Sequence, residues 1–357
     1  MGIQNKTNRL IHFDLMRIIA CFFVILIHVG IFDQLKDVPN QSIDTVFGNL
    51  YGIISRWAVP CFFMLSGLMF LDKNKEIPLK KLYGKYILRL AVAYVVWSCI
   101  YAIYNSFYDA GPTLYEKFKY FLNYCISGEI HTWYVLVTIG LYIALPIIKL
   151  IIHKANQKAI NYWIIAMFIF ASVIPFIVDW GIPMISGYVA YLNQYMEPFF
   201  FIGYTLYFVL GFNILQSDLS SKQRKIIYSF AGLGFIYCIV IRIVLVSVFD
   251  ISMGALSYLY PNIIFMSLGV FLFFNDYVSR IKFSERMQKV ITTISGLTFG
   301  IYLIHVLMLK VFYRIGINLS ICPVPVSMPV VSLIVFLASM IIIYIIKKIP
   351  VVNKYIC

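Results

Sequence analysis

The sequence predicts an all-α polytopic membrane protein, a single domain built as a bundle of about ten transmembrane helices. Of its 357 residues 62% are hydrophobic and 12% charged, and the mean hydropathy is +0.87. These values lie outside the range of soluble domains. Apolar windows long enough to cross a bilayer recur along the whole chain. They span residues 14–32, 50–71, 86–107, 132–151, 161–179, 199–216, 226–248, 257–275, 291–313 and 328–346.

The distribution of Lys and Arg predicts which ends of these windows face the cytoplasm. With a cytoplasmic N-terminus, most basic residues fall in cytoplasmic flanks such as DKNKEIPLKKLYGKYILR and SRIKFSERMQK. Both termini are then cytoplasmic, and the net charge of +14 is explained by loop bias at a lipid bilayer without a nucleic-acid partner. The exceptions to the bias are Lys36, Arg56, Lys117, Lys119, Arg242, Lys310 and Arg314.

The first window, DLMRIIACFFVILIHV, contains Asp14, Arg17 and His28, which cost several kcal/mol each if they face lipid. On a helix turning 100° per residue, Arg17 and His28 point within about 20° of each other, with Cys21 on the same stripe and Asp14 about a turn below. This face is therefore predicted to point into the protein. The rise from Arg17 to His28 is about 16 Å, which suits the two ends of a long ligand.

The second window contains the stretch SRWAVPCFFMLSGLMF. Pro60 frees a backbone carbonyl one turn earlier, and Ser66 with Gly67 offers a surface for close helix approach. Both are also ordinary packing devices. Arg56 at the outer end either reaches the interface or faces His28, which is expected at the same depth.

The fourth window opens with His131-Thr132-Trp133-Tyr134, expected at the outer surface. This stretch is either an interfacial aromatic cluster or part of a site. Glu197, also expected at the outer edge, is either a solvated anchor or an acid or base.

The ninth window, SGLTFGIYLIHVLML, carries a second polar stripe. Ser295, Thr298, Tyr302 and His305 follow one another at helical spacing and cover one face within about 80°. Neighbouring carbonyls can satisfy such groups singly, whereas four in line also fit a hydrated or ligand-lined cavity.

The seven cysteines show neither a CxxC pair nor another metal-ligand spacing, so no metal site is expected. Only Cys125 and Cys322 fall in segments expected on the outer side of the membrane. Whether these two form a disulfide depends on their distance, which the sequence leaves open.

Four stretches together resemble the acyltransferase-3 family of integral membrane acyltransferases, in particular its stand-alone surface-polysaccharide O-acetyltransferases. They occur in order along the chain: Arg17 and His28 as an Arg-x10-His pair; Val59-Pro60-Cys61-Phe62-Phe63 followed by Ser66-Gly67; His131-Thr132-Trp133-Tyr134; and Ser295 through Gly300-Ile301-Tyr302-Leu303-Ile304-His305.

The resemblance implies transfer of an acetyl or other short acyl group from acyl-CoA, a co-substrate, with no tightly bound cofactor. It also implies an acceptor hydroxyl on a cell-envelope glycan or lipid-linked sugar, and a multi-pass protein of the bacterial cytoplasmic membrane. Many relatives carry a fused SGNH-type esterase domain, and others a racemase domain. We find neither here and expect direct transfer to the acceptor or to a separate partner protein.

On this resemblance the polar residues receive expected roles. Arg17, paired with Asp14, is expected near the CoA phosphates, and His28 near the thioester as general base or as acyl carrier. The donor channel is expected to be lined by Ser66, Ser295, Tyr302 and His305, and the oxyanion or acceptor side by Arg56, His131, Tyr134 and Glu197.

Two other function classes stay open from the residues alone. A secondary transporter or flippase for a small anion or sugar would use the same buried Arg and His, and would show substrate flux without thioester consumption. A sensor or assembly protein with a decayed acyl site would show neither flux nor turnover.

Overall fold

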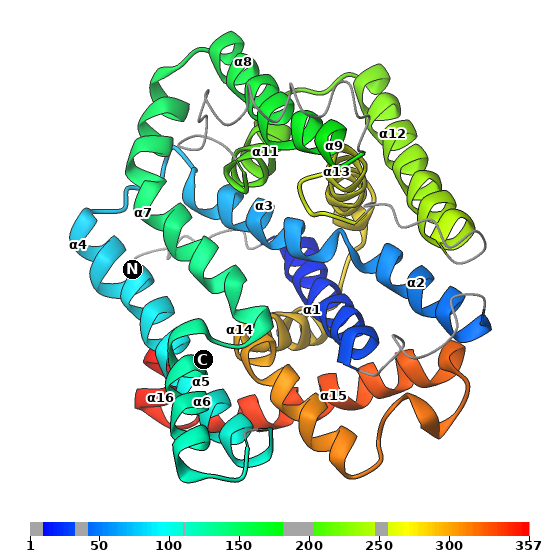
Figure 1. The fold of residues 1–357 in the computed structure, drawn as a ribbon. Coiled ribbons are helices and arrows are strands. Elements are labelled where there is room, and N and C mark those ends of the chain that lie inside the picture. Colours follow the sequence, from blue (N-terminus) through cyan, green and yellow to red (C-terminus); the bar gives the residue numbers. More distant parts are fainter. Residues whose placement is uncertain (1–9, 33–41, 110, 181–202, 247–255, 357) are drawn as a thin grey trace.

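The computed structural model describes residues 10–32, 42–109, 111–180, 203–246 and 256–356. All regular secondary structure in these ranges is helical (Figure 1). Nine helical segments of the described chain are long and apolar enough to cross a membrane. The predicted window at 199–216 corresponds to α11 (Thr205–Gln216), a helix of 12 described residues. The prediction of an all-α polytopic membrane protein is confirmed.

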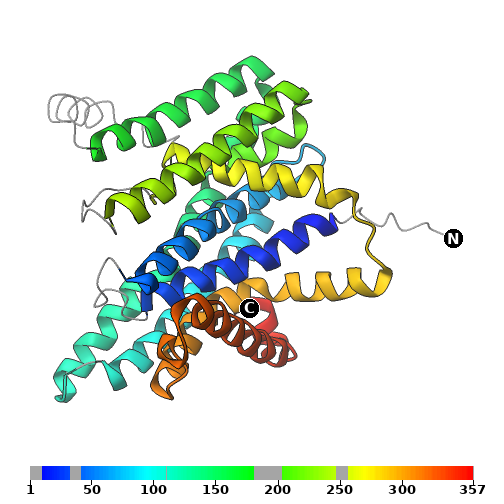
Figure 2. The ribbon, with the colours of Figure 1, turned by 90° about the vertical axis from the view of Figure 1, so that its right-hand side faces the viewer.

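Helix α1 (Ile11–Phe32) lies in the middle of the bundle. It packs against α2 (Ile43–Ser55), α3 (Ala58–Phe70), α13 (Pro261–Asp276), α14 (Glu285–Arg314) and α15 (Val324–Ile346). Figures 1 and 2 show α3 and α13 on one side of α1, and α14 and α15 on the other. Met16, Ala20 and Ile25 are completely buried. Of the polar stripe of α1, Asp14 and Cys21 are buried as well, whereas Arg17 and His28 are partly exposed.

Helices α1, α5 (Leu88–Tyr108) and α14 run in the same direction. Asp14 contacts Ser295 near the start of this group, and Asn105 contacts Lys310 near its end. We call the end where these three helices begin the inner end, following the predicted cytoplasmic side, and the opposite end the outer end.

The second window is divided into α2 and α3, with a break at Arg56 and Trp57. Pro60 lies in the first turn of α3, where a missing backbone donor is tolerated. Helix α3 then packs closely on α11. A Cβ added at Gly67 would lie 1.7 Å from the carbonyl oxygen of Phe208, and one at Gly211 would lie 2.1 Å from that of Met64. The predicted close-approach surface at Gly67 is confirmed.

The chain enters α7 (Trp133–Lys154) in a way that the window pattern does not predict. Helices α5 and α6 (Leu114–Ser127) form a hairpin that projects at the outer end (Figure 2). Gly128, at φ 70°, and the 3₁₀ turn η3 (Ile130–Thr132) then lead into α7. A positive φ favours glycine, which has no Cβ to clash. His131 is 0% exposed, because rings from α1, α5 and α14 surround it, and its expected place at the outer surface is wrong.

The sequence left open whether Cys125 and Cys322 form a disulfide, and the structure answers this. Cys125 on α6 lies 3.8 Å, sulfur to sulfur, from Cys99 on α5. Cys125 and Cys322 are both free thiols, so they do not form a disulfide.

The other described helices complete the bundle or connect its members. They are α4 (Leu79–Lys81), η2 (Leu82–Ile87), α8 (Gln157–Phe168), η4 (Ile169–Val173), α9 (Ile174–Asp179), α12 (Ser221–Ile239), η6 (Val240–Val246), η7 (Val278–Arg280), η8 (Leu319–Ile321) and α16 (Pro350–Tyr355).

Candidate active site

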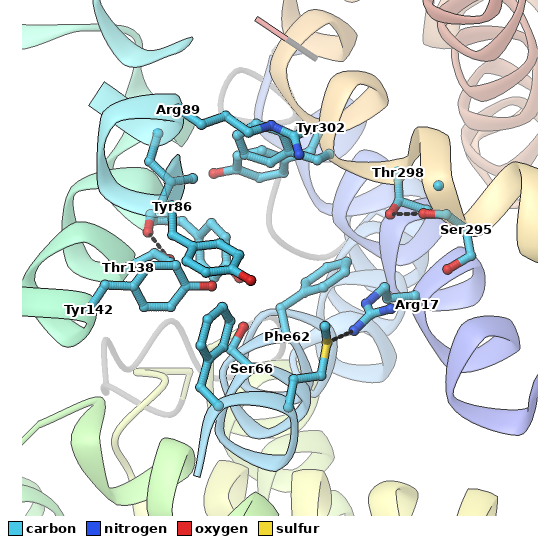
Figure 3. Close-up of a pocket in the computed structure, with 16 residues that line it drawn as sticks. Arg17, Phe62, Ser66, Tyr86, Arg89, Thr138, Tyr142, Ser295, Thr298 and Tyr302 are labelled. Carbon is cyan, nitrogen blue, oxygen red and sulfur yellow. Dashed lines mark hydrogen bonds between the residues drawn. The ribbon is translucent and has the colours of Figure 1, made fainter. Parts of the chain in front are cut away.

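A cavity of about 330 Å³ lies in the inner half of the bundle, between α1, α3, α5, α7 and α14 (Figure 3). Five of the residues predicted for the site contribute to its wall. These are Arg17, Ser66, Tyr134, Ser295 and Tyr302. Tyr134 therefore lies on the same cavity as Arg17, and the expectation that it lines an outer mouth is wrong.

Arg17 is held in place by its own helix and by α14. Its Nη1 lies 3.3 Å from Asp14 Oδ1, one helical turn earlier, which confirms the predicted pair. Ser295 on α14 donates a hydrogen bond of 2.6 Å to the same carboxylate oxygen. Asp14 is only 4% exposed, so both partners satisfy a carboxylate that water barely reaches. Ser295, which was predicted to line the channel for the acyl donor, thus helps to hold Arg17 in place through Asp14.

Arg89 is a second cationic residue of the cavity that the sequence analysis did not single out. It lies in the first turn of α5, and its guanidinium is 5.7 Å from the ring centre of Phe299 on α14. Figure 3 shows Arg17 and Arg89 on different walls of the cavity. In the sequence, Arg89 ends a basic flank and looks like any other interfacial arginine, so only the packing of α5 against α14 indicates a role.

Three histidines from three different elements meet at the outer side of this cavity. The ring centre of His305 on α14 lies 5.1 Å from that of His28 on α1 and 5.0 Å from that of His131 in η3. The His28 and His131 rings are 6.1 Å apart. We call these three residues the imidazole cluster. Sequence reasoning named all three but assigned them to three separate places.

Backbone carbonyls determine which nitrogen carries the proton on two of these rings. His131 Nε2 lies 3.3 Å from the carbonyl oxygen of Leu303, and His305 Nδ1 lies 2.6 Å from that of Tyr302. A carbonyl oxygen only accepts, so these nitrogens donate, and in neutral rings the opposite nitrogen is an acceptor. His131 Nδ1 and His305 Nε2 are buried and have no hydrogen-bond partner within the described residues. Each can accept a proton or a hydrogen bond from a bound molecule.

Tyr302 connects the cavity with the imidazole cluster. It lines the cavity, and its ring centre lies 5.4 Å from that of His131 and 5.7 Å from that of His305. Its hydroxyl donates a hydrogen bond to the backbone carbonyl of His131. The continuous helix α1 spans the same two regions, with Arg17 and His28 about 16 Å apart along its axis.

Two other predicted residues, Arg56 and His305, are not among the described residues that line the cavity. Arg56 lies between α2 and α3, and its guanidinium is 5.3 Å from the ring centre of Tyr258. His305 belongs to the imidazole cluster and is not part of the cavity wall. Glu197 lies outside the described residues.

Comparison with known proteins gives one match. A family model described as an acyltransferase domain, the acyltransferase-3 model, matches residues 10–348. Searches of curated proteins and of solved structures found no match.

Proposed function

The chain belongs to the acyltransferase-3 family, and from this premise we propose that it is a membrane O-acyltransferase that uses acyl-CoA at the cavity and the imidazole cluster. The proposed acceptor is a hydroxyl of a cell-envelope glycan or lipid-linked sugar, and the proposed location is a bacterial cytoplasmic membrane. One observation carries the proposal. A cavity with two arginines on its walls leads, through Tyr302, to three clustered imidazoles, of which His131 and His305 are fully buried.

In the proposed reaction, acyl-CoA enters the cavity from the inner end of the bundle. Arg17 and Arg89 are suited to bind the CoA phosphates, because guanidinium groups pair well with phosphate oxygens. The pantetheine arm follows the cavity past Tyr302, and the thioester reaches the imidazole cluster. The axial distance of about 16 Å between Arg17 and His28 is comparable to the length of such an arm.

His28 acts as general base in the proposed reaction. It removes the proton from the acceptor hydroxyl, and the oxygen attacks the thioester carbonyl. The carbon–sulfur bond breaks, and the CoA thiolate leaves and takes up the proton. His131 and His305 each have a ring nitrogen that can accept a hydrogen bond. These nitrogens orient the substrate hydroxyl or the protonated His28 ring. Arg56 and Glu197 remain the proposed residues of the acceptor and oxyanion side.

CoA release by the purified protein in nanodiscs tests the proposal. Acetyl-CoA is supplied with a crude pool of cell-envelope glycans, and His28→Ala is compared with wild type. His153→Ala is the matched control, because His153 is on α7 and its Nε2 lies 3.2 Å from the carbonyl oxygen of Leu71, away from the cluster. We expect acceptor-dependent release from wild type and His153→Ala, and none from His28→Ala, which still binds CoA.

The same assay without acceptor distinguishes a base from an acyl carrier. A carrier releases one equivalent of CoA per protein before the acceptor is added, whereas a base releases none. Normal acetylation by His28→Ala would refute both forms of the mechanism. If wild type neither binds CoA nor releases it, a flux assay in vesicles tests the transporter alternative.

A further inference from the structure

A buried polar cluster of three residues lies at the outer end of the bundle, beyond the imidazoles. Lys310 Nζ on α14 is 2.7 Å from Glu129 Oε2 and 2.7 Å from Asn105 Oδ1 on α5. Asn105 Nδ2 closes the triangle with a hydrogen bond of 3.1 Å to the same Glu129 oxygen. The side chains of Lys310 and Glu129 are 12% and 7% exposed, and Asn105 is 0% exposed.

The position of Lys310 has no explanation in the general charge pattern. It is one of the few basic residues that break the cytoplasmic bias of Lys and Arg. A buried ion pair contributes little net stability, because removing both charges from water offsets their attraction. Hydrogen bonds in a poorly solvated network do fix the relative positions of their members.

The group that this cluster fixes is the turn that carries His131. Glu129 is the residue before η3, and its Oε1 accepts a hydrogen bond of 3.2 Å from the backbone N–H of Ile130. Its carbonyl accepts a hydrogen bond of 2.7 Å from the hydroxyl of Thr132. One carboxylate oxygen thus holds the turn, while the other holds Lys310.

The two partners of Glu129 belong to the helices that enclose His131. Lys310 follows His305 on α14 by about one and a half turns. Asn105 follows Tyr101 on α5 by about one turn, and the ring centre of Tyr101 lies 5.3 Å from that of His131. The hydrogen bonds of this cluster therefore connect the turn that carries His131 to α14 and to α5, the two helices beside the His131 ring.

We propose that Glu129, Lys310 and Asn105 form a positioning network that holds His131 in the imidazole cluster during acyl transfer. The proposal rests on the function proposed above for its catalytic consequence, whereas its structural consequence can be measured without any activity. None of the three residues lines the cavity, so donor binding does not depend on them.

The test is Glu129→Gln in the full chain in nanodiscs, with hydrogen–deuterium exchange and steady-state kinetics as the two measurements. Asp109→Asn is the matched control. It removes the ion pair of 3.1 Å between Arg314 and Asp109, which also joins α14 to the end of α5 but is 41% and 39% exposed.

For Glu129→Gln we expect faster exchange in the peptide covering residues 128–133 and unchanged exchange in the inner half of α1. The kcat is expected to fall about a hundredfold, the effect of misplacing a reacting group by about 1 Å. The KM for acyl-CoA is expected to stay within twofold of wild type. Asp109→Asn is expected to match wild type in exchange, in kcat and in KM.

A double variant, Glu129→Leu with Lys310→Met, separates positioning from folding, because no buried charge is left unpaired in it. Asn105 loses both of its partners in this variant, so we expect the protein to fold with an apparent unfolding temperature several degrees below that of wild type, while its kcat stays low. Recovery of kcat in this folded variant, or wild-type exchange in the 128–133 peptide of Glu129→Gln, would overturn the proposal. If wild type shows no acyl transfer, the proposed function fails, and the exchange measurement still decides the positioning role.

Discussion

The close contact between α3 and α11 makes Gly67→Ala the most specific structural prediction. The added Cβ would lie 1.7 Å from the carbonyl oxygen of Phe208 and 2.6 Å from its carbonyl carbon. An ordinary carbon–oxygen contact is about 3.3 Å, so the two helices must separate by roughly 1.6 Å. The obstacle is backbone, which cannot rotate away as a side chain can.

The expected cost of Gly67→Ala follows from this geometry. Overpacking a close-packed interior typically costs about 1–3 kcal/mol, and the better helix propensity of Ala offsets only about 1 kcal/mol of it. Because Ser66 and Phe62 on α3 line the cavity, a shift of this helix is also expected to weaken CoA binding.

The assay is the apparent unfolding temperature in nanodiscs, with and without CoA. Gly140→Ala on α7 is the control, since a Cβ there has no atom within 4 Å and Gly140 is exposed. We expect a drop of several degrees for Gly67→Ala, and an unchanged or higher value for Gly140→Ala. Equal behaviour of the two variants would refute the close-approach reasoning.

Three further substitutions test the cavity. Arg89→Gln is expected to raise the KM for acyl-CoA with little change in kcat, and a kinetic comparison at low and high salt checks that the lost contact is electrostatic. Ser295→Ala removes the hydrogen bond to Asp14 and is expected to weaken CoA binding, measured by calorimetry, by about 1.5–3 kcal/mol at most. Tyr302→Phe leaves the His131 carbonyl without its donor and is expected to destabilise the protein by about 1–3 kcal/mol and to lower kcat, with unfolding and turnover measured on the same preparation.

Much of the fold could be predicted because a membrane imposes simple rules. Every spanning segment must be long, apolar and helical, since lipid offers the backbone no hydrogen-bond partners. Each of the ten predicted windows accordingly contains helix in its described part. The Asp14–Arg17 pair was equally predictable, because residues three apart on a helix lie on one face.

The predictions failed where the chain departs from one straight helix per window. The fourth window begins inside the bundle, because the turn after Gly128 packs His131 between Tyr101 on α5 and His305 on α14. Window analysis cannot detect this, because hydropathy reports how apolar a segment is and not which side chains pack around its first turn. His131 was consequently assigned to the outer surface, although it lies 5.0 Å, ring centre to ring centre, from His305.

The membrane class, the helical windows, the polar stripes of α1 and α14 and the candidate histidines all follow from the order of residues along the chain. The meeting of the histidines, the shared cavity of Arg89 and Arg17 and the pairing of Lys310 with Glu129 depend on how the helices pack. The physical reason is that helices in lipid gain little from burying apolar surface against one another. Their neighbours are instead selected by shape and by scattered polar contacts, and neither leaves a periodic pattern in the sequence.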